Sequence, residues 1–457
     1  RSVSIFVCQS CGAETRQYFG RCSNCGEWNS IVEEKISLSK TKSRKKKSLN
    51  SENLSSNRSE PIALAQKTNF ERIKTGYAEF DRVLGGGLVP GSLVLVGGDP
   101  GIGKSTLLLK SATAMAINND VLYITAEESA HQVRLRWQRT NNREQSNLHL
   151  FAETDLDEII EELNNYQPKI AIIDSIQALN NSELTSASGS VSQVRECSAA
   201  LQQIAKAKNI ALLLVGHVTK EGILAGPKVL EHLVDAVLTF EGDRFGSHRL
   251  LRAVKNRFGA TNELGVFEMQ GEGLIEVTNP SELFLSNESA SGVATIVAYE
   301  GSRPIAVDLQ ALINPTTFAT PRRTATGVES NRLHQILAVI EKHLGLALSR
   351  QDCYLAVAGG LEIDEPAADL GIACAIVSSY KNLKLPQGTI LIGEIGLGGQ
   401  LRAVKQISQR IQEAIRLGFI RAVVPQEVKQ KYKYNENKFE LLEAENIQEA
   451  LIKALSI

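Results

Sequence analysis

The stretch SLVLVGGDPGIGKSTLLLKSATAMA, residues 92–116, constrains the fold more than any other part of this sequence. An apolar run suited to a buried strand leads into a glycine-rich loop, and a helix-forming run follows. The loop matches G-x-x-x-x-G-K-[ST], a pattern in which backbone N–H groups and a helix N-terminus surround phosphate oxygens. We therefore expect an α/β fold with a phosphate site at these residues: Gly98, Asp99, Pro100, Gly101, Ile102, Gly103, Lys104, Ser105 and Thr106.

Three later apolar runs end in polar residues that suit the same site. VLYITAEES ends at Glu127 and Glu128, KIAIIDSIQ at Asp174, and IALLLVGHVTK at His217. Ligands of open α/β sheets bind at the carboxyl ends of the strands, so these side chains should converge on the loop.

The residue types suggest roles in phosphate chemistry. Lys104 suits the β- and γ-phosphate oxygens of ATP, and Ser105 with Asp174 suits Mg²⁺. Glu127 suits the residue that orients the attacking water, with its neighbour Glu128 as the alternative. His217 either senses the γ-phosphate or caps an element.

Four of the seven cysteines crowd the first 25 residues, as Cys8, Cys11, Cys22 and Cys25. They form two C-x-x-C knuckles, each followed by glycine, which is the spacing of a four-thiolate Zn²⁺ site. Disulfides are the alternative, but the segment has too few apolar residues to fold without a metal. We expect Trp28 to pack on the knuckle rather than to bind a nucleic-acid base.

Composition divides the chain further. Residues 36–60 are polar and serine-rich around KTKSRKKKS, a composition that favours a flexible linker, either a solvated spacer or a contact for phosphate. At about 150 residues per domain, 457 residues suit about three domains. The expected boundaries are residues 1–35 for the zinc motif, 36–60 for the linker, 61–280 for the α/β domain and 281–457 for a separate α+β domain.

Charge and hydropathy exclude several partners. With 50 Lys and Arg against 51 Asp and Glu, the net charge is −1, so any nucleic-acid binding must be local. No apolar run reaches about 18 residues, and no signal-peptide pattern begins the sequence, so we expect no membrane contact and a cytoplasmic protein.

The stretch LRAVKNRFGATNE, residues 251–263, places Lys255 and Arg257 two positions apart at the end of an apolar run. Side chains at i and i+2 of an extended segment point to the same side, so the two cations can reach one target. A solvated strand end is the alternative reading.

Together, FVCQSCG, GRCSNCGEWNS, GGDPGIGKSTLLL, KNRFG and the run LLLVGHVTKEGILAGPKVLEHLVDAVLTFEGD resemble the bacterial RadA (also called Sms) family of recombination ATPases along essentially the whole chain. The resemblance implies a RecA-like P-loop ATPase core, a zinc-binding N-terminal motif and a Lon-protease-like C-terminal domain. It also implies a hexameric ring that moves along single-stranded DNA and drives branch migration of recombination intermediates with the RecA recombinase. The expected cofactors are ATP, Mg²⁺ and Zn²⁺.

The resemblance also assigns residues. Lys255 and Arg257 are expected to enter the nucleotide site of the neighbouring subunit. DNA is expected at two loops, LNNSELTSASGSVSQVRE and VTKEGILAGPK, where Arg195, Lys220 and Lys228 supply positive charge. In the Lon-like block Ala367 replaces the serine nucleophile and Ser408 the catalytic lysine, while Lys405 has no nucleophile to activate.

Three functions are compatible with these features. The first is an ATP-driven DNA motor. The second is a recombination mediator that ATP switches between states without unwinding DNA. The third, weakened by Ala367 and Ser408, is an ATP-dependent protease.

Overall fold

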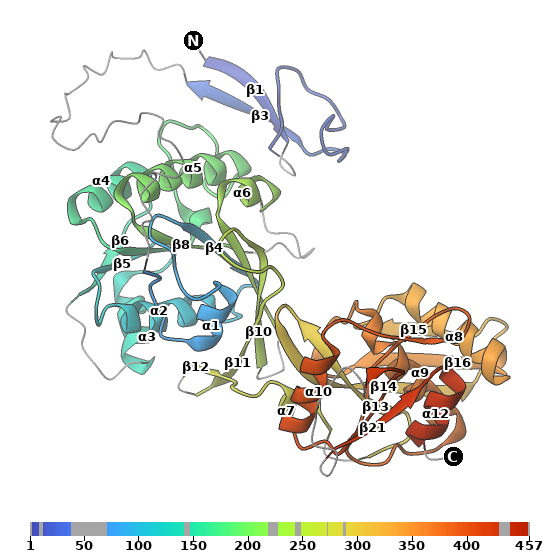
Figure 1. Cartoon of the computed structure of the whole chain (residues 1–457). Helices are drawn as coiled ribbons and strands as arrows, with labels where there is room; N and C mark the ends of the chain where they lie inside the picture. The colour runs from blue at the N-terminus through green and yellow to red at the C-terminus, as the bar shows by residue number, and fades with distance from the viewer. Residues whose placement is uncertain are drawn as a thin grey trace, which may run out of the picture. The chain divides into compact units, whose positions relative to one another are not determined.

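The computed structural model describes residues 2–8, 12–37, 71–140, 147–217, 227–242, 248–271, 273–286, 289–428 and 439–455. The chain forms two compact units, residues 1–277 and 278–457 (Figure 1). Within the described part, no helix has both the length and the apolar character needed to cross a membrane.

The N-terminal segment forms a small ribbon of three strands, β1 (Ser2–Cys8), β2 (Glu14–Thr15) and β3 (Ile31–Ser37). Strand β1 lies between the other two and pairs antiparallel with both. The two knuckles have the same backbone bonding: the N–H of Gly12 donates to the carbonyl of Cys8, and that of Gly26 to Cys22. Both glycines have a positive φ, 71° and 76°, which explains why glycine follows each C-x-x-C pair.

The rest of the first unit is built on a nine-stranded sheet of order β12-β11-β10-β9-β4-β8-β7-β5-β6. Six neighbouring strands, from β9 to β6, are parallel, as the alternation of apolar runs and helices predicts. The strands are β4 (Leu93–Gly98), β5 (Val121–Thr125), β6 (Leu148–Ala152), β7 (Ile170–Asp174), β8 (Ala211–Val215), β9 (Ala236–Glu241), β10 (His248–Asn256), β11 (Leu264–Gln270) and β12 (Gly273–Glu276).

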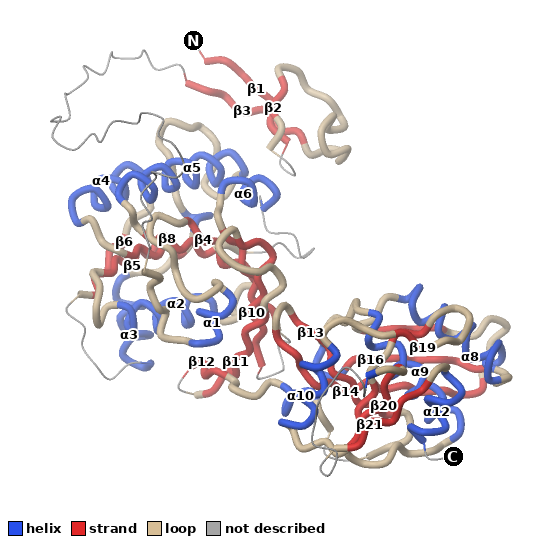
Figure 2. Tube along the Cα trace, in the orientation of Figure 1, coloured by secondary structure: helices blue, strands red, loops and turns tan. Residues whose placement is uncertain are grey.

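Helices cover both faces of this sheet (Figure 2). On β4, Val94 and Val96 face the core formed with α1, α2 and α3, whereas Leu93 and Leu95 face the core formed with α4, α5 and α6. A strand buried on both faces carries a continuous apolar run, which is why LVLV precedes the loop. The helices are α1 (Ala78–Val83), α2 (Lys104–Met115), α3 (Ala130–Thr140), α4 (Leu156–Tyr166), α5 (Val191–Lys208) and α6 (Pro227–Leu233), with a 3₁₀ turn, η1, at Ile176–Ala178.

Strand β10 runs opposite to the parallel strands, because it pairs antiparallel with β9. Its last residue, Asn256, lies opposite Ala236 at the beginning of β9, whereas the last residue of β4, Gly98, lies opposite Phe240. The end of β10 therefore lies at the amino edge of the parallel strands, away from the phosphate loop.

The second unit contains a mixed seven-stranded sheet of order β15-β16-β14-β13-β17-β20-β21. Residues 293–315 form an antiparallel strand pair, one helix is closed by Gly345, and another helix follows Ala367. In the run 389–402, β17 (Thr389–Leu391) joins the large sheet, while β18 (Glu394–Ile395) and β19 (Leu401–Arg402) pair with each other.

The strands of this unit are β13 (Val293–Glu300), β14 (Arg303–Pro315), β15 (Arg323–Thr326), β16 (Gln351–Val357), β17 (Thr389–Leu391), β18 (Glu394–Ile395), β19 (Leu401–Arg402), β20 (Arg421–Pro425) and β21 (Glu440–Ala444). Its helices are α7 (Ser281–Phe284), α8 (Ser330–Leu344), α9 (Asp369–Lys381), α10 (Ile407–Arg416) and α12 (Ile447–Leu455), with 3₁₀ turns at Leu348–Arg350, Ala358–Gly360 and Pro366–Ala368.

An ion pair joins the segments that carry Ala367 and Ser408. Glu365, two residues before Ala367, accepts two hydrogen bonds of 2.6 and 2.5 Å from Arg410, two residues after Ser408. Arg410 is only 2% exposed, donates to the carbonyls of Val297 and Lys405, and lies over the Tyr299 ring. A structural ion pair thus links the two segments in which the dyad residues are replaced.

Replacing Glu365 by alanine should leave the Arg410 guanidinium buried without its counter-charge. Removing one partner of a buried pair destabilises a fold by about 3–5 kcal/mol. We expect a matching loss of protection for the β13 and β14 amides in native-state hydrogen exchange. Arg402→Ala is the control, because Arg402 is 54% exposed and 3.7 Å from Glu394, so its loss should have an effect below about 1 kcal/mol. Equal protection in the two variants would contradict the prediction.

Candidate nucleotide and metal sites

The loop between β4 and α2 has the backbone geometry of a phosphate cradle. Gly98, Gly101 and Gly103 have φ values of 150°, 78° and 114°, which residues with a Cβ atom rarely adopt. At Gly98 a Cβ would also come within 2.4 Å of the Phe240 carbonyl oxygen. These glycines are therefore required by the path of the backbone, and not only by the motif.

Helix α2 begins at Lys104 with its N-terminus directed into this loop. Its N-cap, Gly103, offers no side-chain cap, and the first turn contains no acidic residue. The first N–H groups of a helix and its dipole favour an anion at such an end. The Lys104 ammonium donates to the carbonyls of Gly98 and Asp99, at 2.7 and 2.9 Å, so it lies at the same loop. The residues present fit a phosphate group.

Two side chains that the sequence did not reveal support the phosphate loop and the nearby carboxylate of Asp174. The buried Arg249, on β10, donates to the Ile102 carbonyl at 3.2 Å. The buried Tyr123, on β5, donates its hydroxyl to Asp174 at 2.7 Å and so fixes the carboxylate at the end of β7. Neither belongs to a short motif, so only the fold brings them to the site.

The carboxylates at the strand ends also influence Lys104. Burial lowers the pKa of Lys104 below its usual value, while the negative charges of Asp174, Asp99 and Glu127 oppose that shift. The expected convergence of strand ends on the loop is thus present in the structure.

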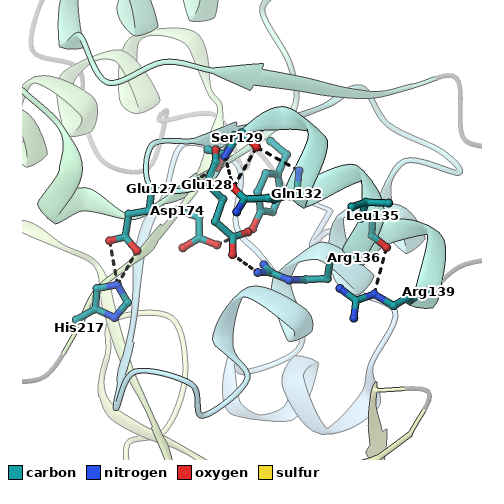
Figure 3. Close-up of polar contacts among 11 residues, drawn as sticks. Glu127, Glu128, Ser129, Gln132, Leu135, Arg136, Arg139, Asp174 and His217 are labelled. Carbon is teal, nitrogen blue, oxygen red and sulfur yellow. Dashed lines mark hydrogen bonds and ion pairs between the residues drawn. The ribbon is translucent and has the colours of Figure 1, made fainter.

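Glu127 and Glu128 take different partners (Figure 3). The Glu127 carboxylate lies 3.0 Å from Nε2 of His217, at the end of β8, and accepts a hydrogen bond from the Ser175 hydroxyl. Glu128 instead pairs with Arg136 on α3. Of the two, Glu127 is the one joined to side chains at other strand ends.

The pKa of Glu127 is lowered from its ordinary value. The hydrogen bond with His217 is the largest cause; the Ser175 hydroxyl and the charge of Lys104 act in the same direction, and burial acts against them. His217 therefore has a definite position, in contact with the glutamate that is the candidate to orient water.

Lys255 and Arg257 do reach one segment, but it belongs to their own chain. Lys255 donates to the carbonyls of Glu231 and Val234, the latter at 2.8 Å, and so caps the C-terminal end of α6. Arg257 pairs with Asp235 at 3.0 Å and keeps half of its side chain exposed. Neither cation contacts the phosphate loop of the same chain, because they lie at the opposite edge of the sheet.

The residues expected to contact DNA are only partly described. Arg195 lies in the first turns of α5 and pairs with Glu196 at 3.2 Å. Lys220 lies outside the described residues, and Lys228 occupies a position of α6 whose side chain is not described.

Three of the four knuckle cysteines lie together. The ligand sulfur atoms of Cys8, Cys22 and Cys25 are all within 4.8 Å of one another, and Cys11 lies outside the described residues. The sulfurs of Cys8 and Cys25 are 3.7 Å apart. A disulfide requires about 2.05 Å, whereas a tetrahedral shell with Zn–S bonds of about 2.3 Å places its sulfurs about 3.8 Å apart. The geometry fits zinc.

Trp28, expected to pack on the knuckle, lies on its outside rather than in its core. Its side chain is 68% exposed, and its ring contacts the Arg21 guanidinium instead. The small core of the ribbon is formed by Cys8, Cys22 and Ile31, with Phe6 and Ala13 packed against it, and does not include Trp28.

Three segments match known family models: residues 6–33 match the rubredoxin metal binding domain, 58–222 an AAA domain, and 322–428 subunit ChlI of Mg-chelatase. The DNA repair protein RadA of Synechocystis is 52% identical over 92% of this chain and 88% of its own length. The RadA of Listeria monocytogenes is 49% identical over 100% and 99%, and that of Bacillus subtilis 50% identical over 93% of each. The chain belongs to the RadA family of DNA repair proteins.

Membership of the RadA family explains why the three parts occur together. The AAA match assigns the glycine loop to an ATPase domain of RecA-like fold, which implies ATP and Mg²⁺ as its ligands. The rubredoxin-type match and the cysteine cluster indicate Zn²⁺ at the N-terminal ribbon. The third match lies in the Lon-like unit.

We expect one zinc ion per chain, held by the four knuckle thiolates. Cys22→Ser should lose the metal, which metal analysis of the purified protein measures, yet leave the ATPase core folded, because the ribbon has a separate small core. Ser111→Ala, a change inside the ATPase core, should retain full zinc. A disulfide in place of zinc in the wild-type protein would contradict the assignment.

His217→Ala should raise the pKa of Glu127 toward its ordinary value, because it removes the largest cause of the lowered pKa. The base is then protonated at a higher pH, so the acidic limb of the kcat/KM profile for ATP hydrolysis should move upward. Glu128→Gln, which alters only the carboxylate paired with Arg136, should leave that limb in place. A shift of the limb in Glu128→Gln rather than in His217→Ala would assign the base to Glu128.

Proposed function

We propose that this chain is an ATP-driven motor on single-stranded DNA that works as a hexameric ring and drives branch migration with the RecA recombinase. One observation carries the proposal: the phosphate loop and the pair Lys255 and Arg257 lie at opposite edges of one sheet. Along β4, Val94 pairs with Ala236 and Gly98 with Phe240, a separation of about 13 Å at 3.3 Å per residue.

This arrangement suits subunits that face each other around a ring. Each subunit presents its phosphate loop at one edge and its two cations at the other, so a cation meets a phosphate only across a subunit boundary. Arg257, half exposed, suits this role better than Lys255, whose ammonium is engaged with the α6 carbonyls. Hydrolysis in one subunit would then depend on its neighbour, as ordered movement along a strand requires.

The chain's own residues define the steps within one site. The loop N–H groups and Lys104 bind the phosphates, Ser105 and Asp174 hold Mg²⁺, and Tyr123 orients Asp174. When bound, Mg²⁺ would neutralise part of the negative charge on the phosphates. Glu127, held ionised by its lowered pKa, orients a water for attack and accepts its proton, while His217 positions Glu127.

Two observations bear on DNA. The name shared by the relatives, DNA repair protein, supports a nucleic-acid substrate. His217, which contacts Glu127, is followed directly in the sequence by VTKEGILAGPK, one of the two segments expected to bind DNA, so a strand bound there would lie next to the residue that contacts Glu127. With Arg195, Lys220 and Lys228 as its cations, core binding would be to phosphate and strongly dependent on salt.

A mediator that ATP switches without unwinding DNA is the alternative. Hydrolysis stimulated by single-stranded DNA together with strand unwinding supports the motor, whereas ATP-dependent binding without unwinding supports the switch. Proteolysis is not proposed, because Ala367 has no hydroxyl to acylate and Ser408 cannot replace a lysine as the base.

Arg257→Ala should reduce ATP hydrolysis by a factor of order 10³, as for arginine fingers acting between subunits. Mixing it with Lys104→Ala should restore part of the activity. In mixed assemblies some sites combine the intact loop of an Arg257→Ala chain with the intact cation of a Lys104→Ala chain. Arg252→Ala, on the strand β10 that leads to Arg257, is the control and should stay within about threefold.

Absence of recovery, with co-assembly of the two chains demonstrated, would mean that Arg257 acts within its own subunit or that hydrolysis requires the whole ring intact. Unchanged hydrolysis by Arg257→Ala alone would make the pair a solvated strand end.

A further inference from the structure

The zinc ribbon carries an unusual concentration of exposed aromatic side chains. Among the described residues, four Phe, Tyr or Trp side chains are exposed large hydrophobics, and three of them belong to the ribbon: Tyr18 at 57%, Phe19 at 49% and Trp28 at 68%. The ribbon leaves these three rings on its surface rather than in its core. They contribute neither to the metal site nor to the ATPase site described above.

The backbone brings Trp28 and a cation, Arg21, to one surface. Residues 19–21 lie beside residues 28–29, because Arg21 and Trp28 form an antiparallel bridge and the N–H of Asn29 donates to the Gly20 carbonyl at 2.8 Å. Side chains opposite each other in such a pair share a face. The Arg21 guanidinium accordingly lies 5.7 Å from the centre of the Trp28 ring, while its Nε donates to the Gly26 carbonyl.

The Tyr18 ring is held in place by a contact with strand β1 of the ribbon. Tyr18 packs edge-on against Phe6 of β1 with the ring centres 6.1 Å apart, so it has a fixed position despite its exposure. Rings that are fixed and yet accessible lose little conformational entropy when a planar ligand stacks on them.

The surrounding charge identifies the kind of planar ligand. Arg16 and Arg21 are both exposed and flank the aromatic stretch. The sequence that follows the ribbon contains six Lys or Arg between positions 40 and 47, in a chain whose net charge is −1. Aromatic platforms beside positive charge are the combination that binds single-stranded nucleic acid, in which bases stack and phosphates pair with cations.

We propose that Tyr18, Phe19 and Trp28 form a stacking surface for the bases of single-stranded DNA. None of the three residues belongs to the expected DNA loops of the ATPase core, which contain no aromatic residue. This proposal rests on the proposed function in one respect only: the single strand that binds is assumed to be DNA. The ribbon contacts bases without reading their sequence, since every base offers a flat face.

Trp28 reports on this contact directly. The chain has two tryptophans, so in a full-length Trp137→Phe protein all tryptophan emission comes from Trp28. An oligodeoxythymidylate of about 20 nucleotides should quench that emission, and added salt should reverse the effect. A strand of the same length and charge that lacks bases should not quench it. Equal quenching by the abasic strand, or none by the thymidylate when binding is verified by anisotropy, overturns the proposal.

Affinity gives an independent measure in the wild-type background. Trp28→Ala should weaken binding of the thymidylate at least fivefold, in line with the loss of one stacked base. Val32→Ala is the matched control, because Val32 is 49% exposed in the same ribbon but has no aromatic face. Both variants should retain zinc. Unchanged DNA affinity in Trp28→Ala would assign the surface to another ligand, such as a protein, and would refute the proposal.

These experiments test the stacking surface separately from the proposed motor. Quenching of Trp28 without DNA-stimulated hydrolysis or unwinding would support the stacking surface and contradict the motor. Unwinding by the wild-type chain with no response of Trp28 would do the reverse.

Discussion

The direction of the strands is the constraint on which the rest of the ATPase unit depends. Six parallel strands deliver their carboxyl ends to one edge of the sheet, and the residues that suit phosphate chemistry follow those ends. Strand β10 runs the other way and delivers Lys255 and Arg257 to the opposite edge. Reversing this one strand would bring both cations beside the phosphate loop of their own chain and remove any need for a neighbour.

Much of this arrangement follows from the sequence, because its signals are local. A glycine loop between a strand and a helix requires particular φ values at neighbouring positions, and the three loop glycines have them. The apolar runs before Glu127 and Asp174 are continuous because their strands are buried on both faces. The paired cysteines require a tight turn and a following glycine, so their spacing alone indicates the metal.

The parts that the sequence did not reveal depend on contacts between distant segments. Tyr123 and Arg249 read as ordinary strand residues until the sheet places them against Asp174 and the Ile102 carbonyl. The partner of Glu127, His217, is 90 residues away. The exposure of Trp28 has a related origin: a tryptophan near a knuckle suggests packing, but whether its ring turns inward depends on which residues of the folded ribbon form the core. Ala367 and Ser408 indicated a lost dyad, yet the ion pair that joins their segments becomes visible only in the fold.

The same sheet provides a rigid connection between the loop and the cation of one subunit. Asp235 accepts a hydrogen bond from the Leu93 N–H at the beginning of β4 and holds Arg257 with its other oxygen. The backbone of Asp235 also bonds to Leu93 and to Arg257, at 2.8 and 3.0 Å. Strand β4 continues, fully buried, to Gly98 and the phosphate loop. A tightly packed core transmits small displacements rather than absorbing them. Arg257 and the phosphate loop are therefore attached to the two ends of a single buried strand, β4.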